Sequence, residues 1–149
     1  MKIAVGADHA GWKDKEWIAE RLRRAGHEVV DFGTRSEEPV DYPDFAVAAA
    51  RAVARGDCDR GVLVCGTGIG MSMAANKVPG VRAAACQTAD GARYSRAHND
   101  ANVLCLGSRL NEEDELRAIL EAWFDTDFEG GRHERRVNKI NALDEGGPC

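Results

Sequence analysis

Short apolar runs alternate with longer amphipathic segments along most of the chain. The runs predict strands at about 2–7, 27–33, 61–65, 81–86 and 102–107. The segments between them carry apolar residues at helical spacing and predict helices over 11–25, from 41 to about 55, from within 68–77, up to about 97, and from 111 onward. Strands and helices alternate five times along the chain, and this pattern indicates an α/β fold. We expect a Rossmann-like three-layer sandwich with a five-stranded parallel sheet.

Glycine, proline and acidic residues mark several helix ends. Gly26 and Gly56 follow the first two helices, where glycine commonly ends a helix. Pro43 stands near the first position of the second helix, which suits its fixed φ. Asn111 is expected to cap the fifth helix, because the acidic residues 112–114 that follow suit the positive end of a helix dipole.

One more helix is predicted over about 131–143, after the hinge EGGR at 129–132. It comes after the fifth strand–helix unit and is set apart from the α/β core. It would either cover the edge of the sheet or reach a partner subunit. We find no linker or repeat, so residues 1–149 are expected to form a single domain with this extra C-terminal helix, whose last few residues fray.

Composition narrows the classes of function. The 149 residues suit one domain, with ordinary hydrophobic (44%) and charged (30%) fractions. A net charge of −5 argues against general nucleic-acid binding, which needs a broad basic face. No apolar run approaches the length of a membrane span, and the N-terminus lacks the apolar segment of a signal peptide. We therefore expect a cytoplasmic protein that binds neither nucleic acid nor membrane.

The cysteines do not form a recognisable framework. There are five, at 58, 65, 86, 105 and 149, and no two have CxxC spacing. This disfavours a disulfide scaffold, a zinc knuckle and a thioredoxin-type site, and it suits a reducing compartment. Cys86 and Cys105 lie within apolar runs and are interpreted as core thiols.

Polar and reactive residues follow the predicted strands. In a parallel sheet, ligands bind outside the carboxyl ends of the strands, near the point where the strand order reverses. We therefore expect one cluster at one edge of the sheet, made of Asp8, His9, Gly11, Gly33, Thr34, Arg35, Cys65 to Gly70, His98, Asn99, Asp100, Gly107, Ser108 and Arg109.

The stretch VLVCGTGIGMS, at 62–72, places a thiol at the start of a glycine loop. The loop matches neither a P-loop nor a dinucleotide fingerprint, because Met71 stands where each motif requires glycine. Either its N–H groups bind an anionic oxygen, or the glycines only form a tight turn. Likewise Cys65 is either a core thiol or a thiol activated at a helix N-terminus, with Thr67 close enough to hydrogen-bond it or the ligand.

Histidines and arginines add two further candidate groups. His9 and His98 are either fillers or proton-transfer groups, since imidazole titrates near neutral pH. Arg132 and Arg136 are four residues apart and share a helix face. In an acidic protein that pair indicates either capture of a small dianion such as phosphate, or a solvated charged helix.

Four motifs in order now make the pattern specific: GADHAG, CGTGIGMS…ANK, RAHNDANVLCLGSR and FEGGRHERRV. Together they closely resemble the ribose-5-phosphate isomerase B family, which also includes the subunits of galactose-6-phosphate isomerase. The resemblance extends from residue 1 to about 143. It implies an aldose–ketose isomerase acting on a sugar phosphate, without metal or organic cofactor. Its members are homodimers, sometimes dimers of dimers, whose sites combine residues of two subunits.

The resemblance also implies roles for individual residues. Cys65 is the expected general base, and His98 the general acid that also opens the sugar ring. Some relatives use a glutamate a few residues further on as base, but residues 72–74 here offer no carboxylate. Thr67 and Asp8 complete the expected catalytic group. The residues expected to bind substrate are Asp8, His9, Gly66, Thr67, Gly68, Ile69, Gly70, Asn99, Arg109, Arg132 and Arg136.

The expected reaction moves a proton between C1 and C2 of an open-chain sugar through an enediolate. A thiolate at residue 65 would carry the proton, and the GTGIG amides would stabilise the anionic oxygen. The expected substrate pair is D-ribose 5-phosphate and D-ribulose 5-phosphate, with a hexose or tetrose phosphate as the alternative. From other classes, a flavodoxin-like nucleotide-binding module and a thiol-based redox protein remain open.

Overall fold

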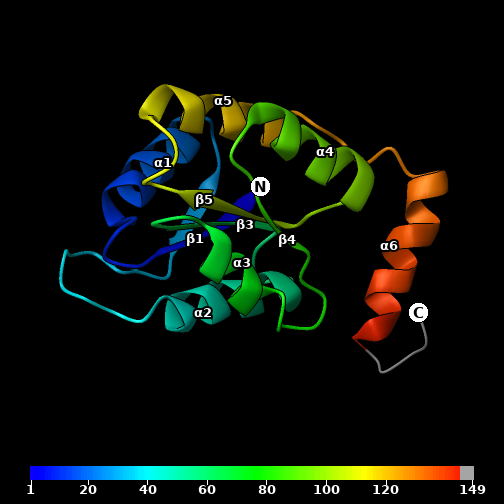
Figure 1. The fold of residues 1–149 in the computed structure, drawn as a ribbon, viewed down its shortest axis with the longest axis horizontal. Helices are drawn as coiled ribbons and strands as arrows, with labels where there is room; N and C mark the ends of the chain where they lie inside the picture. The colour runs from blue at the N-terminus through cyan, green and yellow to red at the C-terminus, as the bar shows by residue number, and fades with distance from the viewer. Residues whose placement is uncertain (145–149) are drawn as a thin grey trace.

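Five parallel strands form one sheet in the computed structural model, which describes residues 1–144 (Figure 1). Cys149 and the expected fraying of the last residues lie outside the described part. The strands are β1 (Lys2–Ala7), β2 (Glu28–Asp31), β3 (Arg60–Cys65), β4 (Ala83–Ala85) and β5 (Val103–Gly107). The helices are α1 (Trp12–Arg24), α2 (Tyr42–Ala54), α3 (Ile69–Ala75), α4 (Ala89–Asn99), α5 (Glu113–Phe124) and α6 (Arg132–Leu143).

The strand order is β2-β1-β3-β5-β4, and every neighbouring pair is parallel. The chain leaves β1 to one side for β2 and then crosses to the other side for β3. It goes on to the far edge for β4 and returns to insert β5 between β3 and β4. The predicted parallel α/β sheet is thereby confirmed, and the strand order reverses between β1 and β3.

Helices cover both faces of the sheet, as predicted. Helices α1, α4 and α5 lie on one face, and α2 and α3 on the other (Figure 1). The first face is packed with large side chains such as Ile18 and Trp123, which are fully buried. The second is packed mainly with alanines of α2 and with Leu63 and Met71. The small alanine side chains let α2 approach the sheet closely. Met71, which stands where a nucleotide-binding loop would have glycine, is fully buried in this core.

Helix α6 stands outside the sandwich, beside the end of α4 (Figure 1). Gly130 and Gly131, both with positive φ, let the chain turn sharply before it begins. The helix is mostly exposed; His133 and Val137 are buried, and Asn141 and Ala142 are half-buried. Asn141 anchors its far end by accepting a hydrogen bond from the Arg82 guanidinium at 2.9 Å. The expected extra C-terminal helix is therefore present and is attached to the core along one side.

Two local expectations need correction. Asn111 does not cap α5; instead its side-chain N–H donates to the carbonyl of Gln87 at 2.9 Å. Glu112 is the N-cap, paired with Glu115 in a reciprocal capping box, because a carboxylate accepts a hydrogen bond from a backbone N–H as an amide does. The fourth strand is shorter than expected, since it sits at the sheet edge and pairs with β5 only over residues 83–85.

The cysteines at 58, 65, 86 and 105 are free and buried. Burial raises the pKa of the thiols of Cys58, Cys86 and Cys105. Cys86 and Cys105 therefore belong to the core, as predicted. Within residues 1–144, every helix is too short or too polar to cross a bilayer.

Candidate active site

The carboxyl ends of β1 and β3 form the first part of the site. These strands are neighbours, and Asp8 and Cys65 stand at their ends. The N–H of Asp8 donates to the carbonyl of Val64 at 3.3 Å, which joins the two loops. The candidate base thus lies at the strand-order reversal, where open α/β sheets bind ligands.

Cys65 is fixed by the glycine loop. The N–H of Gly68 donates to its Sγ at 3.1 Å, and the side chain is 5% exposed. Gly68 has φ +76°, and a Cβ there would lie 3.0–3.1 Å from the backbone of Cys105 and Leu106. Only glycine fits this turn, so the turn aims an N–H at the sulfur. A donor at that position stabilises the negative charge of a thiolate.

Three loops are packed tightly around this thiol. A Cβ on Gly11 would lie 2.6 Å from the Val64 carbonyl, and one on Gly107 would lie 2.8 Å from the Thr67 carbonyl carbon. The hydroxyl of Ser108 lies 2.9 Å from the carbonyl oxygen of Ala10 and 3.1 Å from that of Cys65. The loops after β1, β3 and β5 therefore form one rigid edge.

Asp8 and His9 are oriented by their own surroundings. Asp8 is 7% exposed, and its Oδ1 accepts N–H bonds from Ala10 at 2.9 Å and Gly11 at 3.1 Å. Nδ1 of His9 accepts the N–H of Val40 at 3.2 Å. In the neutral ring this bond places the proton on Nε2, so the free nitrogen of His9 is a donor.

Thr67 and Arg109 complete this half of the predicted site. Thr67 Oγ1 accepts the N–H of Ile69 at 3.3 Å, so the hydroxyl hydrogen stays free for another partner. The Arg109 side chain lies over Gly66, whose Cβ would meet its guanidinium carbon at 3.3 Å. Both side chains border the glycine loop beside Cys65.

Tyr42, the first residue of α2, is a further neighbour of the glycine loop. Its ring lies against Gly70, where a Cβ would come within 2.7 Å of the ring carbon Cζ. Nothing in the local sequence marks it, because the contact joins two helices that are distant along the chain.

His98 and Asn99 do not lie at this edge. They occupy the last turn of α4, and α4 leads from the carboxyl end of β4 back to the amino end of β5. The following residue, Asp100, accepts hydrogen bonds from Arg82 at 3.1 Å and Arg96 at 2.8 Å, beside the starts of β4 and β5. The expectation of one cluster at one edge is therefore wrong for His98, Asn99 and Asp100 within a single chain.

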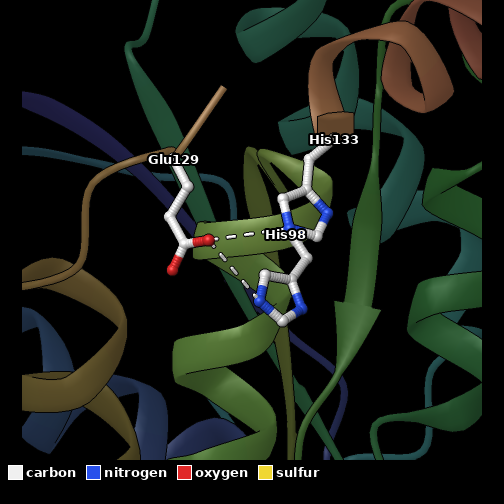
Figure 2. A group of neighbouring side chains, drawn as sticks. All are labelled: His98, Glu129 and His133. Carbon is white, nitrogen blue, oxygen red and sulfur yellow. Dashed lines mark ion pairs between the residues drawn. The ribbon is translucent and has the colours of Figure 1, made fainter. Parts of the chain in front are cut away.

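Helix α6 brings the arginine pair to His98. Arg132 and Arg136 are exposed on α6, and His133 between them stacks on the His98 ring (Figure 2). Burial, the neighbouring His98 and Arg132 lower the pKa of His133, which favours its neutral ring. The structure therefore groups the predicted residues into two half-sites: Asp8, His9, Cys65 to Gly70 and Arg109 at one edge, and His98, Asn99, Arg132 and Arg136 at the other.

Comparisons with known proteins identify the family of the chain. Residues 3–140 match the sequence model of a family described as Ribose/Galactose Isomerase. Ribose-5-phosphate isomerase B of Escherichia coli is 47% identical over 144 residues, covering 97% of each chain. A D-erythrulose-4-phosphate isomerase of Pectobacterium atrosepticum is 42% identical, covering 94% of this chain and 93% of its own. The structure of Clostridium thermocellum ribose-5-phosphate isomerase B superposes with a TM-score of 0.96 at 51% identity, covering 98% of this chain and 99% of the other.

Proposed function

The chain belongs to the ribose/galactose isomerase family, and from that premise we propose that it interconverts D-ribose 5-phosphate and D-ribulose 5-phosphate through an enediolate. It is an aldose–ketose isomerase, as the near-complete match to ribose-5-phosphate isomerases B establishes. This assignment replaces the nucleotide-binding and thiol-redox alternatives. The residues that perform the reaction and the assembly that unites them are the proposal.

The observation that carries the proposal is the thiol held by a glycine loop at the strand-order reversal. Cys65, as thiolate, removes the proton from C2 of the open-chain aldose and returns it to C1. In the first turn of α3 the N–H of Ile69 donates to Thr67 Oγ1, and the N–H of Gly70, which has no acceptor within the helix, is assigned to the oxygen that becomes anionic. Removal of the C2 proton leaves the negative charge on O1 of the enediolate. The O2 hydroxyl proton passes to O1, and Cys65 then gives its proton to C1, so that C2 becomes the carbonyl carbon and the sulfur is a thiolate again.

The second half-site supplies the acid that opens the sugar ring and a pair of arginines for the phosphate. His98 donates a proton to the ring oxygen when the furanose opens, and Arg132 and Arg136 bind the phosphate. Phosphate binding, remote from the reacting carbons, positions C1 and C2 against the thiol. We assign the remaining contacts with the sugar hydroxyls and the phosphate to Asp8, His9, Asn99 and Arg109.

The two half-sites unite in a homodimer. Helix α4 starts at the carboxyl edge of the sheet, where Cys65 lies, and carries His98 at its other end. Its 11 residues span about 16 Å, so His98 and Cys65 of one chain do not flank one small sugar. A two-fold related copy that presents its His98 and α6 to the Cys65 edge completes two equal sites, as an isologous interface requires. A dimer of such dimers is compatible with the same sites. The buried free thiols favour the reducing cytoplasm as the location.

Substrate length is the point on which relatives differ. The Pectobacterium relative is named for a four-carbon substrate, which favours a tetrose phosphate as the second candidate. NMR in deuterated water with four-, five- and six-carbon aldose phosphates separates these. We expect ketose formation and deuterium at C1 or C2 with the five-carbon substrate preferred. Preference for the four-carbon substrate would reassign the substrate, and silence across the panel would overturn the proposed reaction.

A further inference from the structure

His98 is held in a stack of three rings. The His133 ring lies parallel to it, with centroids 4.2 Å apart and planes inclined by 5° (Figure 2). Tyr94, one turn earlier on α4, stacks on it as well, with centroids 5.0 Å apart and planes inclined by 28°. The His98 side chain is 33% exposed, and an exposed imidazole on its own has a broad torsional range about χ2. Stacking on a buried ring removes much of that freedom.

Glu129 reaches the same nitrogen edge of both imidazoles. Its Oε2 lies 3.8 Å from Nε2 of His98 and 3.6 Å from Nε2 of His133 (Figure 2). The backbone N–H of Glu129 donates to the carbonyl of Ala97 at 3.0 Å, which ties its loop to the last turn of α4. The fold therefore places the backbone of Glu129 beside the two rings, and its carboxylate, in a side chain that is 60% exposed, reaches both.

Two histidines and a glutamate also suggest a metal site, but the ring geometry does not fit one. A metal ion lies near the plane of each imidazole that binds it, along the nitrogen lone pair. Two rings stacked face to face, 5° from parallel, direct their lone pairs side by side and not at a common point. The arrangement fits ring stacking with a shared carboxylate.

We infer that His133 and Glu129 are positioning residues for His98. The inference rests on the proposed function, in which His98 is the acid. Glu129 favours a proton on Nε2, the nitrogen that its carboxylate faces, so the proton that His98 gives to the sugar leaves from Nδ1 and the ring is left as the Nε2–H tautomer. A carboxylate behind an imidazole fixes the tautomer and stabilises the imidazolium in many enzymes. His133 supplies the flat surface that keeps the ring in that orientation.

The charges around the stack are consistent with this role. His133 is nearly buried, and its pKa is lowered by burial, by His98 and by Arg132 and Arg136, and raised by Glu129. A neutral His133 adds no positive charge to the face of the His98 ring on which it stacks. Because His133 lies between Arg132 and Arg136 on α6, one helix both binds the phosphate and orients the acid.

The test compares His133→Ala, which loses the stack, with His133→Phe, which keeps a flat ring. Nitrogen NMR of the His98 ring reports its tautomer in each homodimer, and steady-state kinetics report kcat and KM. We expect His133→Ala to mix the tautomers of His98 and to lower kcat by about tenfold with KM nearly unchanged, since general acid catalysis is typically worth more than that. His133→Phe should restore most of kcat. Glu129→Ala should also mix the tautomers, and the exposed Glu134→Ala on the same helix is the matched control.

The readouts separate this inference from the proposed function. If the His98 signals stay unchanged in both His133→Ala and Glu129→Ala, the positioning role is wrong, whatever the rate does. If the tautomers mix while kcat stays at the wild-type value, the positioning geometry stands, and His98 is not the acid. Equal loss of kcat in His133→Phe and His133→Ala would also overturn the stacking role.

Discussion

Cys65 and His98 lie at opposite ends of the parallel strands. Cys65 ends β3 at the carboxyl edge, whereas His98 lies in the last turn of α4, at the amino edge. Each is surrounded by the other residues expected of a sugar-phosphate site. The arrangement is consistent with one surface that offers the base and a second that offers the acid and the phosphate-binding arginines, and hence with catalysis by an assembly of two chains.

Replacing Cys65 by alanine is expected to abolish turnover. The sulfur is the only group at the loop that we assign to proton transfer, and removing a catalytic base costs roughly a hundredfold or more in kcat. Substrate binding should persist, because the arginines and loop amides remain. Kinetics together with calorimetric titration of the substrate measure the two effects separately.

Cys58→Ala is the matched control for Cys65→Ala. Cys58 is a buried thiol in the same core cluster; it precedes β3, whereas Cys65 is the last residue of that strand. It should keep near-wild-type kcat. A Cys65→Ala enzyme that is as active as the Cys58→Ala enzyme would remove Cys65 from the role of base.

Replacing Arg136 by alanine is expected to raise KM strongly and to change the free energy of unfolding little. Arg136 is exposed on α6, so little packing is lost, whereas a charged hydrogen bond to phosphate is worth about 1.5–3 kcal/mol, or roughly ten- to a hundredfold in affinity. Arg135→Ala, next to it and also exposed, is the control. An unchanged KM in Arg136→Ala would exclude Arg136 from the phosphate site.

A third prediction concerns the buried ion pair that joins α1 to β2. Lys15 is fully buried, and its Nζ donates to both oxygens of Asp31, at 2.8 and 2.7 Å. Burial alone would raise the pKa of Asp31, but the hydrogen bonds from Lys15 and from the N–H of Gly33 outweigh it, and the pKa is lowered. The stabilisation is therefore complete above the unfolded pKa of about 4 and is lost as the pH falls through the folded value.

Asp31→Asn is expected to lower the free energy of unfolding by about 2 kcal/mol at neutral pH, less than for an isolated buried pair because Glu16 still faces Lys15 at 2.9 Å. Urea unfolding at several pH values measures the effect. The difference from wild type should shrink as the pH falls from about 4, where the carboxyl of the unfolded chain takes up its proton, through the lowered pKa of Asp31 in the folded protein. Asp57→Asn, which breaks an exposed pair with Arg55, should change stability by less than about 1 kcal/mol at any pH. A pH-independent difference for Asp31→Asn would contradict the assignment.

The strands and helices were largely predictable because their signals are local. The apolar run ending at Cys65 and the glycines after the first two helices required no knowledge of distant residues. Strand order was not predictable in the same way. The insertion of β5 between β3 and β4 depends on how whole strand–helix units pack, and the position of His98 follows from the direction in which α4 runs.

The site was predictable by residue but not by arrangement. The glycine loop, Cys65 and the arginine pair could be singled out from sequence, whereas their division between two edges could not. Glu129, His133 and Tyr94 carried no signal of their own, because their link to His98 arises only when the loop before α6 folds onto α4. The burial of Lys15 was equally hidden, since lysine in an amphipathic helix usually faces solvent.

The most direct measurement is complementation between two inactive variants. Cys65→Ala and His98→Asn homodimers are mixed, dissociated and reassembled, and native mass spectrometry verifies that mixed dimers form. If each site takes its thiol from one chain and its histidine from the other, a mixed dimer contains one intact site, and an equal mixture should recover about a quarter of wild-type activity. A mixture that contains mixed dimers and stays as inactive as its parents would contradict the shared site.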